Sequence, residues 1–442
     1  MELNFESKVI KKLNKRILWL LMLGYFISIL DRANISVASL TMNDELGISP
    51  MVYGYGASLF VIGYFVFQVP SNIILERMGA RWWLPRIMIS WGLVTVGMIF
   101  TNGITSYYGM RFLLGIVEAG FYPGIIFYLS LFYPYQHRTK AIALFQVASP
   151  FSLMIGIPLI GLFFNMHGFL GLHGWQHIFI FTGIPALILA ILYIIYLRST
   201  IGQTKWLLKE EQEWLTKEIE KETMGKPKAQ VKFYQVFLES QVWLATLILF
   251  CINVGFYSVV FWIPQIVKSV GNHDNLVTTL LSGVPYVFTT FAVILVSRHS
   301  DKSGERKKHL SFCLVASSLG FYLSSVATGV PFALFGLSLA TGGLLAAMPV
   351  LWTFPISMFS GAAAATAIAT INSIGALGGI IGPSVIGFAA EKTGKPASGL
   401  GVVALFMFVA FVISLFLKIY GKDTKEARST LPKISNVRFM KR

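Results

Sequence analysis

The segment ERMGAR at residues 76–81 recurs as DKSGER at residues 301–306. Both copies read acid, base, any residue, glycine, any residue, arginine, and the second lies 225 positions after the first (76 to 301). Glycine permits a tight turn, and the charges can hold neighbouring helix ends together. A repeat at this offset predicts two similar halves. We expect these loops to act as gates through Glu76, Arg77, Gly79, Arg81, Asp301, Gly304 and Arg306.

The chain around this repeat is too apolar for a soluble protein. Of its 442 residues, 55% are hydrophobic and only 13% are charged, whereas soluble domains carry about 25% charged residues. Mean hydropathy is +0.68. Such a chain cannot cover itself with polar surface, so lipid is expected to be its main solvent.

Twelve apolar runs are long enough to cross a bilayer, which takes about 20 helical residues. Backbone groups in lipid must be bonded within their own segment, which predicts helices. The first set lies near 17–40, 52–75, 82–101, 104–132, 140–165 and 177–198. The second set lies near 240–266, 276–297, 309–328, 331–354, 362–390 and 399–419. The sequence therefore predicts an all-α membrane protein with twelve transmembrane helices in two six-helix halves.

These runs divide the chain into five parts. We expect an N-tail at 1–16, an N-terminal half at 17–198, a linker at 199–239, a C-terminal half at 240–420 and a C-tail at 421–442. The linker contains KEEQEWLTKEIEKE (209–222), where Glu and Lys recur at helical spacings. This pattern is typical of a solvated helix. A partner site on it is the alternative.

The basic residues fix the orientation of the chain. With both termini in the cytoplasm, 31 of the 36 Lys and Arg residues fall in cytoplasmic segments, and only Lys268, Lys392 and Lys395 fall in opposite loops. This asymmetry follows the positive-inside rule. The net charge of +16 is therefore explained by topology and does not indicate a nucleic-acid partner. We expect a multi-pass protein of the cell inner membrane.

The clear charges within the membrane, once every loop is assigned, are Asp31, Arg32, Arg111 and Glu118. An ionised side chain at the bilayer centre costs at least ~2.5 kcal/mol, so such residues usually face a cavity or a partner. The structural alternative is two static ion pairs that hold helices together. Buried ion pairs are a poor source of stability, which favours a functional role.

The spacing of the four charges limits how they can pair. Asp31 and Arg32 are adjacent, so their side chains diverge by about 100°. Arg111 and Glu118 share a face of one helix but lie about 10 Å apart along it. Counting the helical rise from each membrane entry puts Asp31 and Arg111 at similar depth. We therefore predict an Asp31–Arg111 contact between helices, with Glu118 nearer the middle of the membrane.

Each residue type suits a task in transport. A carboxyl group in a cavity is pulled toward its protonated form by desolvation and toward its charged form by a nearby guanidinium. A group balanced in this way can take a proton on one side of the membrane and release it on the other. Arginine stays protonated and presents a planar fork that suits a carboxylate.

Three stretches resemble a known family: RFLLGIVEAGFYPG at 111–124, DRANI at 31–35 and PSN at 70–72. Together with the paired loops and the 6+6 count, they resemble the anion:cation symporter branch of the major facilitator superfamily. That branch includes bacterial hexonate, hexuronate, tartrate and phthalate permeases and the animal sialin and vesicular glutamate carriers. The resemblance covers essentially the whole chain. It implies a major facilitator fold that works as a rocker switch, with a central site between the halves.

The resemblance also implies roles. Asp31 and Glu118 match acids that serve proton coupling, and Arg32 matches an arginine that holds the anionic substrate. Arg111 would tune the acids or hold substrate in one state. The uncharged lining is expected to comprise Tyr64, Gln146, Ser149, Trp352 and Asn372, with Asn253 and Tyr257 as weaker candidates.

Parts of this lining have alternatives. Tyr and Trp in membrane helices are often packing residues or interface anchors. Asn372 could instead form a helix–helix hydrogen bond. The seventh span contains no arginine, unlike the phosphate-ester exchangers and glutamate carriers of the superfamily. This departure argues against a clamp with one arginine from each half.

Three functions are compatible with these residues. The favoured one is proton-coupled uptake of a small organic anion, such as a sugar acid or other carboxylate. The others are proton-driven export of a drug or a chelating metabolite, and a membrane receptor that moves no solute. We expect no enzymatic activity, cofactor or metal, because no nucleotide-binding loop, zinc spacing or nucleophile–base pattern occurs. We expect the protein to act as a monomer.

Overall fold

The computed structural model describes residues 2–224, 237–271, 273–358 and 361–418. Within these ranges every regular element is a helix. The first group comprises α1 (Glu2–Leu13), η1 (Asn14–Leu18), α2 (Trp19–Leu46), α3 (Pro50–Met78), α4 (Ala80–Gly97), η2 (Met98–Phe100), α5 (Ile104–Glu118), α6 (Phe121–Phe132), α7 (Tyr135–Gln146), α8 (Ala148–Gly161), η3 (Leu162–Met166), η4 (Phe169–Gly171) and α9 (Gly174–Tyr196).

A connecting segment carries η5 (Ile201–Gln203) and α10 (Lys209–Met224). The second group comprises α12 (Ser240–Gly271), α13 (Asn275–Ser303), α14 (Arg306–Ser325), α15 (Val330–Met358), α16 (Gly361–Gly375), α17 (Gly378–Thr393), η6 (Pro396–Gly399) and α18 (Leu400–Ser414). Three of the predicted spans are each divided into two helices: α5 and α6, α7 and α8, and α16 and α17.

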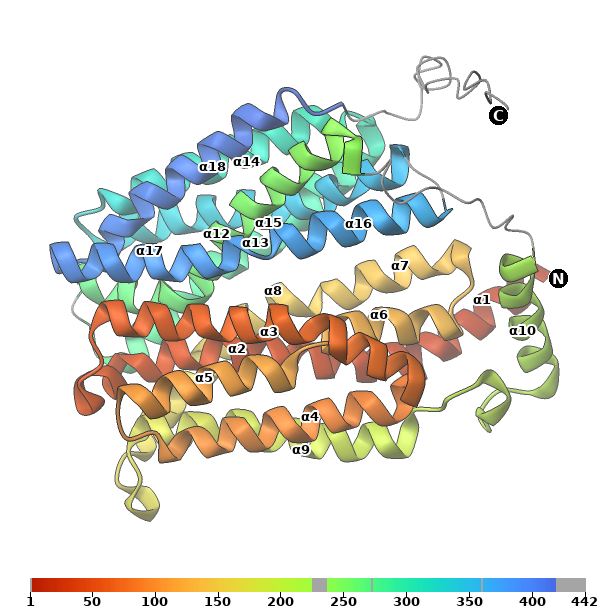
Figure 1. The fold of residues 1–442 in the computed structure, drawn as a ribbon, viewed down its shortest axis with the longest axis horizontal. Coiled ribbons are helices and arrows are strands. Elements are labelled where there is room, and N and C mark those ends of the chain that lie inside the picture. The colour runs from red at the N-terminus through yellow and green to blue at the C-terminus, as the bar shows by residue number, and fades with distance from the viewer. Residues whose placement is uncertain (1, 225–236, 272, 359–360, 419–442) are drawn as a thin grey trace, which may run out of the picture.

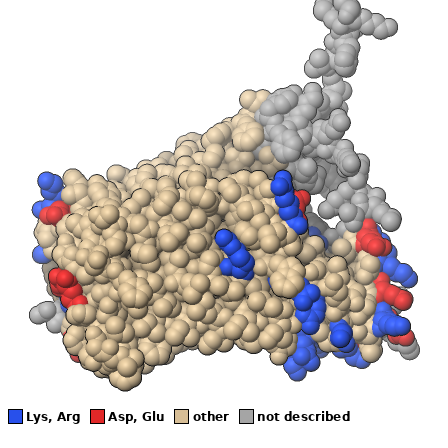
Figure 2. Space-filling model, turned by 60° about the horizontal axis from the view of Figure 1, so that its bottom comes forward, with Lys and Arg blue, Asp and Glu red and all other residues tan. Residues whose placement is uncertain are grey.

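Eleven helical segments in the described ranges are long and apolar enough to cross a membrane. The helix α14 fills the place of the predicted ninth span but carries several serines, which lower its hydropathy. Those serines are bonded inside the bundle: Ser317 donates to Ala340 O and Ser318 to Ala404 O, both at 2.8 Å. Such bonds join neighbouring membrane helices, so α14 is the twelfth span. The face of the bundle shown in Figure 2 has a largely uncharged middle between charged ends, as expected for a surface in contact with lipid.

The two groups of helices meet along three pairs, α2 with α12, α3 with α17 and α8 with α13. We call the end that holds α1 and α10 the α10 end, and the opposite end, where α2 ends and α3 begins, the far end (Figure 1). Hydrogen bonds between the groups lie at the far end. Tyr53 Oη donates to Phe261 O at 2.7 Å, and Ser58 Oγ donates to Ile380 O at 2.6 Å.

Further contacts strengthen this far-end seam. Gln265 Nε2 donates to Ser39 Oγ at 2.7 Å. A Cβ added to Gly54 would lie 2.6 Å from Pro383 O, so backbones there approach as only glycine allows. Among the described residues, no hydrogen bond joins the two groups at the α10 end. The conformation is therefore closed at the far end.

The N-tail predicted at 1–16 is part of the bundle. The helix α1 runs through the π turn η1 into α2 without a break, and Val9 and Leu13 on α1 are fully buried. The helix therefore begins before the span predicted near 17–40, and the predicted N-tail is helical. Hydropathy marks only where a helix enters lipid, whereas α1 is held by other protein segments.

One of those segments is α10, a helix at the position where the linker sequence predicts one. One side of α10 is buried against the protein rather than exposed to solvent. Its Glu211 is buried and accepts hydrogen bonds from Lys12 Nζ at 2.7 and 2.8 Å. The ring of Trp214 packs edge-on against Phe5. Burial alone would raise the pKa of Glu211, but the hydrogen bonds from Lys12 and the Leu208 N–H lower that pKa overall.

The repeated loops both place a glycine at positive φ, but their turns differ in ψ (145° at Gly79 and −8° at Gly304) and they use their charges differently. Gly79 and Gly304 have φ of +82° and +74°, a region that favours glycine. In the second loop Arg306 pairs with Asp301 at 2.5 Å. In the first, Arg81 lies 5.1 Å from the Trp82 ring centroid. Within the described ranges Glu76, Arg77 and Arg81 form no ion pair.

Candidate functional site

The four buried charges lie on two neighbouring spans of the first group. Asp31 and Arg32 come from α2, and Arg111 and Glu118 from α5. Arg32 is 7% exposed, and the other three are 0% exposed. An apolar chain that folds in lipid can hold such charges only if each finds a specific environment.

The central interaction is an ion pair between α2 and α5. Arg32 Nε donates to Glu118 Oε1 at 2.7 Å, and Ser28 Oγ donates to the same oxygen at 2.8 Å. Ser28 lies one turn before Arg32, so both reach Glu118 from one face of α2. Glu118 Oε2 and Arg32 Nη2 are buried, and neither atom has a hydrogen-bond partner among the residues that the structure describes. The pair thus keeps one free acceptor and one free donor.

Asp31 has different partners. Its Oδ2 accepts from Thr95 Oγ1 of α4 at 2.9 Å, and its Oδ1 accepts from Asn34 Nδ2 at 3.1 Å. Asn34 also donates to Thr182 Oγ1 of α9 at 2.9 Å. The predicted Asp31–Arg111 contact is wrong in this conformation, because rotation about α2 turns Asp31 toward α4 and α9.

Within the described ranges, none of the three side-chain nitrogens of Arg111 has a hydrogen-bond partner. Its guanidinium carbon lies 4.9 Å from the Phe60 ring centroid and 5.3 Å from that of Phe261. Aromatic rings attract a cation through their faces. Phe261 belongs to α12, and its carbonyl accepts the bond from Tyr53 at the far-end seam. Arg111 therefore contacts both groups of helices.

Aromatic side chains surround Arg32. Its guanidinium carbon lies 4.8 Å from the Tyr64 ring centroid and 5.8 Å from that of Phe60. The hydroxyls of Tyr25, Tyr64 and Tyr257 are near enough to act electrostatically on Arg32. The structure thus places Tyr64 and Tyr257 beside the central charges. Tyr257 comes from the second group, so both groups contribute to this centre.

The other expected lining residues lie farther from the ion pair or have other partners. Gln146 Nε2 donates to Tyr122 Oη at 2.8 Å. Asn253 Nδ2 donates to Gly375 O at 3.0 Å, next to the end of α16. Ser149, Trp352 and Asn372 are half-buried, and no side-chain hydrogen bond joins them to Arg32 or Glu118 in the described part of the chain.

Several side chains that contact the four buried charges were not predicted from the sequence. They are Ser28, Asn34, Phe60, Thr95 and Phe261. Ser28 and Phe60 could have been found, since each lies four residues before a predicted site residue on the same helix, Arg32 and Tyr64 respectively. Thr95 and Phe261 carry no such signal, because their proximity depends on how helices pack.

Three helix breaks lie beside candidate residues. The first follows Glu118 at Ala119–Gly120, the second is at Val147 between α7 and α8, and the third follows α16 near Asn372. Transporters commonly form their substrate and ion sites at discontinuous helices, whose freed backbone groups can contact ligands. Gln146 lies where a backbone carbonyl lacks its helical donor, because Pro150 has no N–H. The carbonyl of Asn372 accepts from Ala376 N–H at 3.0 Å.

Gly120 makes the first break possible, so Gly120→Ala should destabilise the protein. Its φ is +90°, and an added Cβ would lie 2.2 Å from Ser71 Oγ. The backbone conformation alone costs a side chain about 1–2 kcal/mol, and the clash adds to this. We expect a lower melting temperature in detergent and less monodisperse protein on size exclusion.

Gly109→Ala is the matched control for this change. Gly109 lies in α5, and an added Cβ there meets no atom within 4 Å. Alanine should leave stability unchanged or improve it slightly. A Gly120→Ala protein that melts with wild type would show that the break does not need glycine.

Comparison with known proteins places this arrangement in a family. The sequence model of the Major Facilitator Superfamily matches residues 21–383 and again 272–439. The chain belongs to this superfamily. It is 42% identical over 417 residues to a "Putative tartrate transporter" of Agrobacterium vitis, covering 94% of this chain and 96% of the relative. It is 34% identical over 430 residues to a "Quinolone resistance transporter" of Acinetobacter baumannii, covering 97% and 99%.

Solved structures show the same fold. The inward-open xylose transporter of E. coli superimposes with a TM-score of 0.73 over 94% of this chain and 99% of that chain, at 18% identity. The predicted major facilitator fold is confirmed. As a superfamily member whose relatives are transporters, the protein is a multi-pass membrane transporter and not an enzyme.

Proposed function

We propose that the protein imports a small organic anion, such as a sugar acid or other carboxylate, together with protons by alternating access. The observation that carries this is the buried Arg32–Glu118 pair with one open donor and one open acceptor. Relatives named as tartrate transporters support the anion class. We place the protein in the cell inner membrane with both termini in the cytoplasm, as its charge asymmetry predicts.

The ion pair supplies a physical route to coupling. A deprotonated Glu118 holds Arg32 through Nε at 2.7 Å and neutralises its charge. When Glu118 is protonated, this attraction weakens and Arg32 keeps an uncompensated charge in a low-dielectric site. A substrate carboxylate then restores the balance through the guanidinium fork. Proton binding and anion binding therefore favour each other.

Asp31 is the second proton site in this proposal. No cation lies within ion-pair distance of its carboxylate among the described residues, and its bonds come from neutral Thr95 and Asn34. Asp31 and Glu118 both lie next to Arg32, so their titrations should be coupled. Thr95 and Asn34 link Asp31 to α4 and α9, which lets its protonation affect helix packing.

The conformation supplies one state of the transport cycle. The far-end seam is closed by Tyr53, Ser58 and Gln265, and the far end is the external side in the proposed orientation. The structure then represents the inward-facing state. Opening the seam would withdraw Phe261 from Arg111, so we assign Arg111 to sensing the switch. The repeated loops around Gly79 and Gly304 are the proposed cytoplasmic gates.

Export is the second candidate, because a relative at 34% identity is named for quinolone resistance. An exporter would use the same acids to exchange protons for solute. It would not need an arginine with a free donor at the centre of the site, which favours uptake of an anion. The third alternative, a receptor that moves no solute, does not agree with the transporter family to which the chain belongs.

Transport in proteoliposomes separates these functions. The purified protein would be reconstituted with a pH-sensitive dye inside and exposed to tartrate or a panel of sugar acids. Uptake predicts that protons enter together with the anion. Protons leaving as solute enters would support exchange, and binding of the anion without any movement of solute or protons would contradict the proposal. Because each chain holds all the assigned residues, activity should not depend on oligomerisation.

A further inference from the structure

The helix α1 carries a basic stripe that the transport site does not use. Lys8, Lys11 and Lys15 are all exposed and are spaced by three and four residues, so they share one face of the helix. Trp19 lies four residues after Lys15 on the same face and is 62% exposed. We call Lys8, Lys11, Lys15 and Trp19 the α1 stripe.

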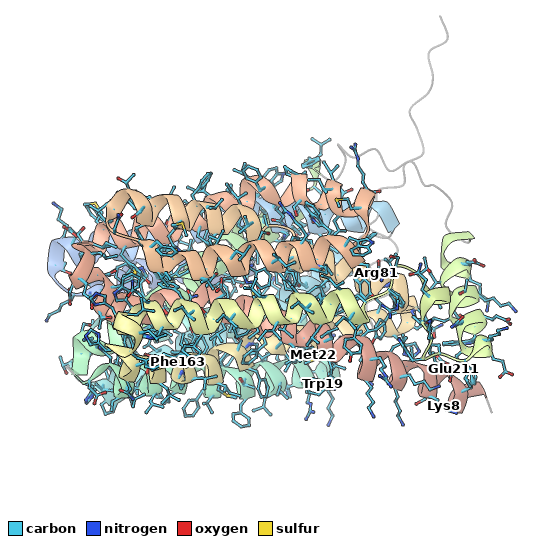
Figure 3. All side chains as sticks on the ribbon, turned by 90° about the horizontal axis from the view of Figure 1, so that it is seen from below. Lys8, Trp19, Met22, Arg81, Phe163 and Glu211 are labelled. Atoms are coloured by element: carbon cyan, nitrogen blue, oxygen red, sulfur yellow. The ribbon has the colours of Figure 1, made fainter. Side chains whose placement is uncertain are left out.

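The opposite side of α1 is bound to the protein. Val9 and Leu13 are fully buried, and Lys12 is paired with Glu211 of α10. Figure 3 shows Lys8 and Trp19 along one edge of the molecule, with Glu211 of α10 on the inner side of α1. The α1 stripe therefore faces away from the protein, because α1 cannot rotate about its axis without breaking these contacts.

The charges of the stripe are not neutralised by the protein. In the described residues no ion pair involves Lys8, Lys11 or Lys15. The nearby acids are already occupied, since Glu6 pairs with His137 and Glu211 pairs with Lys12. Arg16 adds another exposed basic group. The surface thus presents an uncompensated positive charge.

The position of the stripe along the helix indicates its partner. Trp favours the interface between lipid tails and headgroups, and α2 continues from Trp19 into the apolar bundle with Leu23 exposed. With a rise of 1.5 Å per residue, Lys15 lies about 6 Å beyond Trp19 and Lys8 about 16 Å beyond it. Lys15 and Lys11 therefore lie at the depth of the lipid headgroups, and Lys8 lies just outside the headgroup layer.

We propose that the α1 stripe binds the anionic phospholipid headgroups of the adjoining leaflet. Basic clusters immediately beside a membrane span are attracted to anionic lipid surfaces, by about fivefold in affinity per residue. Because α1 is locked to α10, bound headgroups would fix the connecting segment to the first group of helices. This proposal does not depend on what the protein transports.

The test compares lipids on the full-length purified protein in detergent. Phosphatidylglycerol should raise the melting temperature more than phosphatidylcholine does, and high salt should reduce the difference. The triple variant Lys8→Gln, Lys11→Gln, Lys15→Gln should need on the order of 100-fold more phosphatidylglycerol for the same shift. The matched triple Lys205→Gln, Lys209→Gln, Lys217→Gln removes three other exposed lysines and should respond like wild type.

Three results would overturn the proposal. The first is an unchanged response in the stripe variant, and the second is an equal loss in the matched control. The third is a full shift produced by inorganic phosphate alone, which would indicate a free-anion site. A variant of the stripe with three arginines should keep the response, which separates lost charge from damage to the helix.

Discussion

Glu118→Gln should abolish accumulation driven by a pH gradient while leaving exchange of substrate across the membrane. Glutamine keeps the shape of the side chain and can still bond to Ser28 and Arg32, but it cannot carry a proton between the two sides. Each pH unit can support about tenfold accumulation per coupled proton. With that coupling removed, the ratio of internal to external substrate should fall to about one.

The measurement adds labelled substrate outside proteoliposomes, which are empty for net uptake and loaded with unlabelled substrate for counterflow. Net uptake is followed under an imposed pH gradient, and counterflow is followed without one. Glu213→Gln on the exposed face of α10 is the control and should accumulate like wild type. Accumulation that persists in Glu118→Gln would move proton coupling to Asp31 alone.

Much of the fold could be predicted because lipid enforces it. Runs of about 20 apolar residues and the asymmetry of basic loops give the spans and their order. The helix breaks were not predicted, although two have a local cause. Pro123 and Pro150 lack an N–H, so they cannot donate to the carbonyls four residues earlier, at Ala119 and Gln146. The chain breaks at or next to both positions.

The candidate site was predicted as a set of residues but not as a set of contacts. Lipid makes any buried charge conspicuous, which identified Asp31, Arg32, Arg111 and Glu118. Depth could not decide the pairing, because Asp31 and Arg32 differ by only about 1.5 Å along α2. Their directions differ by about 100°, and which one faces Glu118 depends on the rotation of α2 against α5. Hydropathy contains no information about that rotation.

The same limit explains why the partners of Arg111 could not be predicted from the sequence. In the sequence Arg111 lies seven positions before Glu118 on the same helix face, and the carboxylate of Asp31 was its expected partner. The structure gives it two aromatic faces, and one of them comes from the second half of the chain. Contacts between halves also change during alternating access, so a sequence alone cannot assign them to one state.

Arg32→Ala should nearly eliminate anion binding, but the change also leaves Glu118 buried without its cation. Breaking a buried pair in this way is strongly destabilising, by about 3–5 kcal/mol, so the single variant alone cannot distinguish lost binding from lost structure. The double variant Arg32→Ala, Glu118→Gln removes both charges and should fold with a melting temperature near that of Glu118→Gln.

Binding to the double variant then reports on Arg32 itself. A buried, hydrogen-bonded charge pair contributes about 2–5 kcal/mol when one partner is truncated, so affinity for the anion should fall roughly 100-fold or more relative to Glu118→Gln. Arg32→Lys keeps the charge but not the fork, and its affinity should lie between the two. Arg86→Gln, an exposed arginine on α4, should bind normally. An affinity in the double variant equal to that of Glu118→Gln would exclude Arg32 from the anion site and shift the search to Arg111.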